Sequence, residues 1–175
     1  MRMRGNRIVT ALILTCAFVT TAQPAKNSGW RPATESELKN LLPARAPVEQ
    51  ERIKTEMRTA SGITDGHGKF IAGVVLITAG YSAEGKYSHY FLTQVPLKIG
   101  SLELTPGAYV IGWKHASEDK LNVSFYEAAT GKALVATEAT MNPSITRVES
   151  FRIWPPGDRS LMQIGRFTFS YQIGE

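Results

Sequence analysis

Seven stretches of the sequence have the apolar patterning of β-strands, and this feature restricts the possible folds more than any other. In the clearest, residues 162–173 (MQIGRFTFSYQI), Phe, Tyr and Ile alternate with polar side chains. Residues 70–80 (FIAGVVLITAG) are instead continuously apolar, which is typical of a strand covered on both faces. The other five predicted strands are residues 88–100, 108–115, 120–128, 132–140 and 146–154. Turns with glycine or proline separate the strands, so we expect an antiparallel β-sandwich, or a small barrel, over residues 66–175.

The residues ahead of these strands carry helix signals. Thr34 and Glu37 have the spacing of a capping box, in which each residue satisfies a free backbone donor of the other. Pro43 ends this predicted helix because proline has no amide hydrogen to donate. A second helical piece, with a thin apolar side, is predicted over residues 47–58. We therefore expect a helical arm over residues 33–60.

The first 22 residues have the features of a secretory signal peptide. Three arginines precede an apolar run over residues 8–19, and small residues follow at the positions that a signal peptidase reads. The run is shorter than the roughly 20 residues that a membrane-spanning helix needs. We expect cleavage near Ala22, with a flexible leader over residues 23–32 and a secreted or periplasmic protein. An uncleaved interfacial anchor is the alternative.

The single cysteine, Cys16, lies inside the apolar run. The preceding residues ILT loosely resemble a bacterial lipoprotein box, although Thr15 stands where such boxes usually carry Gly, Ala or Ser. Lipoprotein anchoring at Cys16 is therefore a minor alternative. If the chain is cleaved after residue 22, the mature protein has no cysteine, which excludes a disulfide, a thiol nucleophile and a cysteine-rich zinc site. Such a domain must be held together by burial.

The net charge after cleavage is small. The chain has 20 basic and 15 acidic residues, and removal of the three signal-peptide arginines leaves 17 basic residues and a net charge of +2. A surface without a basic excess gives no electrostatic reason to expect nucleic-acid binding. The remaining chain, about 153 residues, has the length of one domain that can fold unaided.

Sequence motifs for catalysis are absent. The chain has no G-x-S-x-G, P-loop, G-x-G-x-x-G or H-E-x-x-H motif. The weak alternative is a metal site made by His67, His89 and His115 with Asp65 nearby, because three imidazoles and a water can bind zinc. The histidines are 22 and 26 residues apart, which matches no ligand signature. We assign no catalytic residue and no cofactor.

Aromatic side chains are the other candidates for a functional surface. Trp113, Tyr126 and Trp154 could form a stacking platform for a glycan or a partner protein. The alternative for aromatic residues at a spacing of two is a place in the core. Tyr126 is the least explained by a core role, because it shares its predicted strand face with Asn122 and Ser124.

Two turns resemble a known class of secreted domains. Residues 104–113 (LTPGAYVIGW) are similar to the L-x-P-G-x-Y stretch of prealbumin-like and collagen-binding B-type sandwiches. Residues 127–134 (EAATGKAL) are similar to the T-G-K hairpin of the same superfamily, although in those families the hairpin comes first. The resemblance implies a similar architecture only. Turn chemistry alone predicts a hairpin here with Gly131 in the left-handed region and Lys132 in solvent.

The functional expectation is an exported, non-catalytic binding or structural module of the cell envelope or periplasm. A small metal-dependent hydrolase using the histidines and a carbohydrate-binding module using the aromatic residues are the alternatives. The sequence leaves the ligand, the partner and the oligomeric state open.

Overall fold

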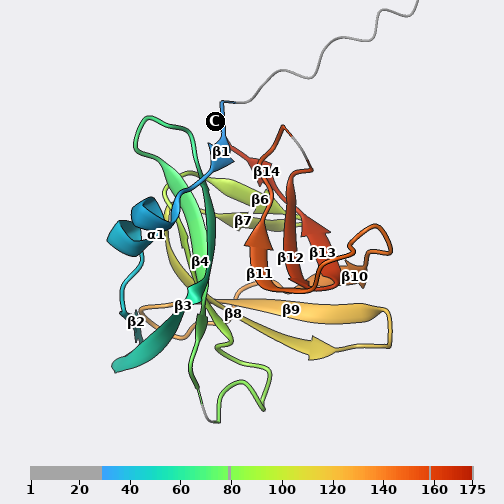
Figure 1. Cartoon of the computed structure of the whole chain (residues 1–175). Helices are drawn as coiled ribbons and strands as arrows, with labels where there is room; N and C mark the ends of the chain where they lie inside the picture. Colours follow the sequence, from blue (N-terminus) through green and yellow to red (C-terminus); the bar gives the residue numbers. More distant parts are fainter. Residues whose placement is uncertain (1–28, 79, 158, 175) are drawn as a thin grey trace, which may run out of the picture.

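The computed structural model describes residues 29–78, 80–157 and 159–174, so the predicted signal peptide and Cys16 lie outside the described residues. The described chain is mainly β, with one short helix, α1 (Glu35–Leu41) (Figure 1). Its strands are β1 (Arg31–Pro32), β2 (Arg45–Val48), β3 (Glu51–Thr64), β4 (Phe70–Leu76), β5 (His89–Thr93), β6 (Leu97–Ile99), β7 (Leu102–Leu104), β8 (Gly107–His115), β9 (Lys120–Glu127), β10 (Thr137–Met141), β11 (Glu149–Ile153), β12 (Leu161–Gly165), β13 (Phe167–Ser170) and β14 (Gln172–Ile173).

The main sheet curls into a nearly closed barrel. Its strand order is β1-β3-β4-β5-β8-β9-β10-β13-β12-β11, all pairings are antiparallel, and β2 pairs with β3 beside this path. The last strand, β11, comes back beside β3, where the backbone N–H of Ile153 donates to the hydroxyl of Ser61 at 3.0 Å. Of the two architectures predicted, the structure is therefore the barrel and not the sandwich.

A small second sheet closes one end of the barrel. Strands β14, β6 and β7 form it, and they lie where β5 ends and β8 begins, in the upper part of Figure 1. Four of its aliphatic side chains are buried in the barrel interior: Leu97, Ile99, Leu102 and Leu104. The opposite end of the barrel holds the β8–β9 hairpin and the β12–β13 turn.

Aromatic side chains fill the middle of the barrel. Phe125 is fully buried and makes edge-to-face contacts with Phe91 and Phe169, each at 6.3 Å between ring centroids. These residues lie on the inward-facing positions of their strands. The interior is thus a packed core, as expected for a small barrel whose side chains fill its centre.

A second apolar cluster lies outside the barrel, between the sheet and a cover made of α1, β2 and part of the β4–β5 loop. Leu38 and Leu42 enter this cluster from the helix, and Val74 and Val110 enter it from β4 and β8. The outer face of these strands is therefore buried as well. This burial explains the continuous apolar run that the sequence shows along β4.

The capping box predicted at Thr34 is confirmed. The amide of Glu37 donates to the Thr34 hydroxyl at 3.2 Å, and the amide of Thr34 donates to the Glu37 carboxylate at 2.7 Å. The wider prediction of a helical arm over residues 33–60 is wrong, because residues 45–48 and 51–64 form the hairpin of β2 and β3.

Four further predictions differ from the structure. There are fourteen described strands instead of seven, in part because long apolar stretches divide at turns. Residues 162–173 belong to three strands, and Gly165, the last residue of β12, has a positive φ where the chain turns into β13. The strand predicted over 132–140 begins only at Thr137. Residues 31–32 of the predicted flexible leader pair with β3 as β1.

The hairpin at residues 127–132 turns as predicted. Gly131 has φ of +67°, and its amide donates to the carbonyl of Glu127 at 2.9 Å. Lys132 is exposed. The Thr-Gly-Lys sequence is therefore explained by chain reversal alone.

Gly112 gives a testable consequence of the close packing between β8 and the β4–β5 loop. A Cβ at this position would overlap the carbonyl oxygen of Gly85 and lie 2.8 Å from Cα of Lys86. We expect Gly112→Ala to lower the free energy of unfolding by about 1–3 kcal/mol, because backbone must move to make room. Gly107→Ala on the same strand is the control, since a Cβ there has 3.6 Å to its nearest neighbour. Equal urea-unfolding midpoints for the two variants would contradict the packing described.

Candidate functional site

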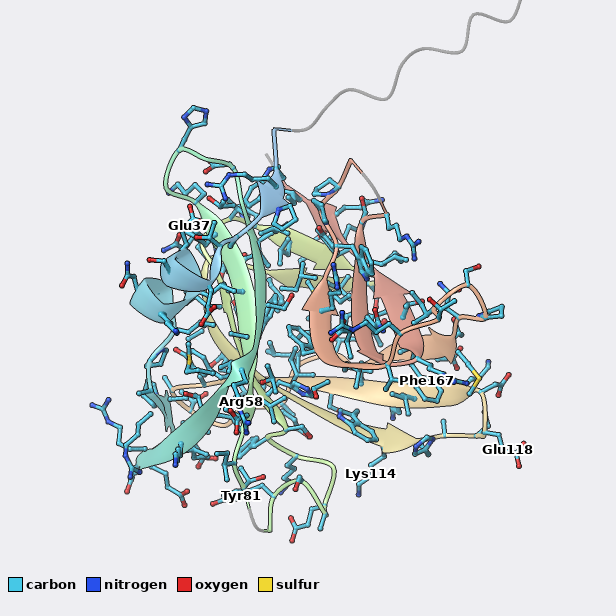
Figure 2. The ribbon with its side chains drawn as sticks, in the orientation of Figure 1. Glu37, Arg58, Tyr81, Lys114, Glu118 and Phe167 are labelled. Atoms are coloured by element: carbon cyan, nitrogen blue, oxygen red, sulfur yellow. The ribbon has the colours of Figure 1, made fainter. Side chains whose placement is uncertain are left out.

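The end of the barrel opposite the small sheet contains a cavity of about 590 Å³. Strands β4, β5, β8, β9, β11 and β12 and the start of β13 contribute to its wall. Phe167 lies there beside the β8–β9 hairpin, whose tip carries Glu118 (Figure 2). We call this the mouth cavity. Its lining is mostly apolar and includes the side chains of Val75, His89, Trp113, His115, Glu149 and Phe167.

The strand register explains why these side chains meet. Val75 on β4 is paired with His89 on β5, which is paired with Ile111 on β8. Side chains of directly paired residues lie on the same face, and residues two apart on one strand share that face. Trp113 and His115 therefore point to the same side as Ile111, which is the inside of the barrel.

His89 is the polar group deepest in this wall. It is only 4% exposed, and its ring lies 5.1 Å from the ring of Phe151 on β11. Nε2 is 3.2 Å from the backbone carbonyl of Ser150, and because a carbonyl can only accept, Nε2 carries the hydrogen. Burial lowers the pKa of His89 to about 4, so the ring is neutral near pH 7. Its other nitrogen, Nδ1, is then a bare acceptor.

Two polar atoms of this wall are buried without a partner. His89 Nδ1 and Trp113 Nε1 make no hydrogen bond to any residue that the structure describes. Buried polar groups are paired in the large majority of cases, so each exception asks for an explanation. Among the described residues there are three such atoms. Two of them belong to residues that line this single cavity, and the third is the hydroxyl of Thr78.

The rim of the mouth cavity is aromatic. His115 packs edge-on against Trp113 at 5.8 Å and against Phe167 at 5.5 Å between ring centroids. Glu149, the carboxylate of the lining, is compensated by Arg147 at 2.9 Å and Arg152 at 3.3 Å. The site thus combines apolar walls, a few hydrogen-bonding groups and a charge that is already paired, which is the usual make-up of a small-molecule site.

No protein-family model, curated protein or solved structure matches this chain.

The structure does not bring the three histidines together. His115 lies four residues beyond the cross-strand partner of His89, so their backbones are about 13 Å apart along the sheet. His67 is exposed on the β3–β4 loop, at the end of the barrel closed by the small sheet. Among the described residues no group of three metal-ligating side chains occurs. Asp65 instead accepts from the backbone amides of His67 and Lys69 and so shapes its own loop.

The three aromatic candidates also lie on different surfaces. Trp113 belongs to the mouth cavity, whereas Tyr126 is on the outer face of β9 and packs edge-on against Tyr87 at 5.4 Å. Trp154 follows β11, where its indole donates to Gln163 at 3.2 Å and the guanidinium of Arg152 lies 4.1 Å from its ring centre. A platform that combines all three is not formed.

A second hollow of about 680 Å³ lies outside the barrel, beside β2, β3 and the β4–β5 loop, where Figure 2 labels Tyr81. Its lining carries charges of both signs: Arg45, Arg52, Lys54, Glu51 and Glu84. The Glu51 carboxylate accepts from the Tyr81 hydroxyl at 2.8 Å. Thr78, whose hydroxyl is also buried without a partner among the described residues, belongs to this lining. We regard the hollow as a weaker candidate than the mouth cavity, because it has one such group and half of its lining residues are charged.

Proposed function

We propose that this protein is a non-catalytic binding module that holds a small, mainly apolar molecule in the mouth cavity. The observation that carries the proposal is the pair of unpartnered buried atoms, His89 Nδ1 and Trp113 Nε1, in the wall of one cavity. The cavity volume, about 590 Å³, lies within the range of 300–1,000 Å³ common for ligand sites. One barrel end is filled by the small sheet, which leaves the mouth as the way in.

A binding role agrees better with the hydrogen bonding of His89 than a hydrolytic one does. A general base in nucleophilic catalysis bonds to the nucleophile and is oriented by a third group. His89 instead gives its Nε2 hydrogen to the Ser150 carbonyl. Its low pKa, caused by burial, also removes it from the range in which a general base works best near neutral pH.

The proposal includes export to the cell envelope or periplasm. It is supported by the arginine-led apolar segment at residues 1–22 and by the absence of cysteine after that segment. Among the described residues there is no helix that meets the length and hydropathy needed to cross a bilayer.

The binding proposal is tested with N-phenyl-1-naphthylamine, an uncharged probe whose fluorescence rises in apolar surroundings. We expect saturable fluorescence enhancement with the wild-type protein. Val75→Trp places an indole into the cavity wall and is expected to weaken binding about tenfold or more, because the probe and the new ring compete for one space.

Val135→Trp is the matched control, because Val135 is 53% exposed and lies outside the lining of the mouth cavity. Both variants should keep the wild-type circular dichroism spectrum. No saturable enhancement with the wild-type protein, or equal binding by both variants, would refute the proposed function.

A further inference from the structure

The unpartnered atoms of the mouth cavity have opposite hydrogen-bonding character. Trp113 Nε1 can only donate. His89 Nδ1 can only accept, because the Ser150 carbonyl fixes the hydrogen of the neutral ring on Nε2. A ligand that satisfies both atoms must therefore present an acceptor to Trp113 and a donor to His89.

The strand register makes the two side chains diagonal neighbours in the wall of the cavity. His89 on β5 is directly opposite Ile111 on β8, and Trp113 is two residues further along β8 on the same face. Such diagonal neighbours in an antiparallel pair have backbones about 7–8 Å apart, within reach of long or aromatic side chains. Both line the mouth cavity.

The surroundings favour an uncharged group. Glu149 already has two arginine partners, at 2.9 and 3.3 Å, and the neutral ring of His89 offers no positive charge to an anion. A charged group brought into this wall would lose hydration without gaining a countercharge. A hydroxyl needs none, and it is both a donor and an acceptor.

We propose that the ligand of the mouth cavity carries an uncharged hydroxyl, alcoholic or phenolic, that donates to His89 Nδ1 and accepts from Trp113 Nε1 while its apolar body packs against the walls. This inference rests on the proposed binding function and specifies the ligand class. The indole and the imidazole would then select hydroxylated molecules over apolar molecules of the same shape, since a site built for a hydroxyl leaves polar groups unpaired with an analogue that lacks it.

The test compares 2-naphthol with 2-methylnaphthalene, which differ only by a hydroxyl in place of a methyl group. Each is used to displace N-phenyl-1-naphthylamine from the wild-type protein and from three variants, Trp113→Phe, His89→Phe and His67→Phe. Wild-type protein is expected to bind 2-naphthol about tenfold more tightly than 2-methylnaphthalene, because two hydrogen bonds are gained. The preference should disappear in Trp113→Phe and His89→Phe, where the hydroxyl loses a partner, and persist in His67→Phe, whose exposed residue lies at the other end of the barrel.

The possible outcomes separate this inference from the function on which it rests. If the probe itself does not bind, the proposed function fails. If the probe binds and 2-naphthol does not displace it, the hydroxyl inference fails and the binding function stands. If both compounds bind wild-type protein equally, the hydroxyl inference fails and the binding function stands, as expected if a water molecule occupies the polar pair. Should His89→Phe not fold, Trp113→Phe decides, and an unchanged preference for 2-naphthol in that variant overturns the assignment.

Discussion

Truncation of Phe125 to alanine is expected to lower the free energy of unfolding by about 3–5 kcal/mol. Phe125 is fully buried at the centre of the barrel and contacts the rings of Phe91 and Phe169. Two free-energy terms add up to this loss. The folded state no longer gains from burying the phenyl ring, and a cavity remains because the surrounding strands cannot move in to fill it. Small domains are stable by only about 5–15 kcal/mol, so this loss is a large share of the total stability.

Chemical denaturation of Phe125→Ala checks this prediction, and Val135→Ala is its control. Val135 is 53% exposed, so its truncation should change the free energy of unfolding by less than about 0.5 kcal/mol. A loss below about 1 kcal/mol for Phe125→Ala would contradict a packed barrel interior.

The second large effect is a loss of stability in mild acid that depends on His89. Burial lowers the pKa of this residue from an ordinary value of 6.5 to about 4. The unfolded chain therefore binds a proton on His89 between these two values, whereas the folded protein does not. Stability is full above about pH 7 and falls as the pH drops toward 4. From pH 7 to 4.5 the loss should be about 2–3 kcal/mol.

This pH window distinguishes His89 from the carboxylates. The pKa of Glu37 is lowered to about 2 by its hydrogen bonds to Arg31 and to the Thr34 amide, so its contribution is lost only as the pH falls below 4.5, its ordinary value. Urea unfolding of wild type and His89→Phe at pH 7, 5.5 and 4.5 measures the effect. The variant should be nearly insensitive to pH over this range. If the free energy of unfolding falls equally with pH in the wild type and in His89→Phe, another group is responsible.

The fold class could be predicted because strand formation depends on patterns that span a few residues. The alternation along residues 120–128 reflects a strand with one buried face, and the continuous apolar run at 70–80 reflects a strand with two buried faces. Both segments form strands of the main sheet, β9 and β4. The capping box at Thr34 is also local, since both partners lie within one helical turn.

The helical prediction over residues 47–58 failed because pairing between strands overrode local propensity. Charged residues with good helix propensity dominate this stretch, but Val48, Ile53 and Thr55 are buried when β2 pairs with β3 and packs on the barrel. A spacing of two, from Ala46 to Val48 and from Ile53 to Thr55, was present in the sequence. Pro47 is tolerated because β2 is an edge strand.

The candidate site was only partly visible in the sequence. Trp113 could be singled out as an aromatic residue, and His89 as one of three histidines. The register between β5 and β8 decides that Trp113 and His89 line the same cavity. The carbonyl of Ser150 on β11 pairs with Nε2 of His89, and Nδ1 is left without a partner among the described residues. Register and closure of a barrel involve residues far apart in the chain, which a single sequence does not reveal. Phe167 and Val75 of the lining were missed for the same reason.

The most direct test of the mouth cavity as a ligand site is the indole N–H resonance of Trp113 in a ¹H–¹⁵N spectrum during titration with 2-naphthol. The protein has three tryptophans, and Trp113→Phe identifies the resonance that belongs to the cavity. We predict a saturable shift of this resonance, because its free N–H gains an acceptor, while that of Trp154, already bonded to Gln163, stays in place. A Trp113 signal that does not move, or equal shifts of all three indoles, would contradict the account.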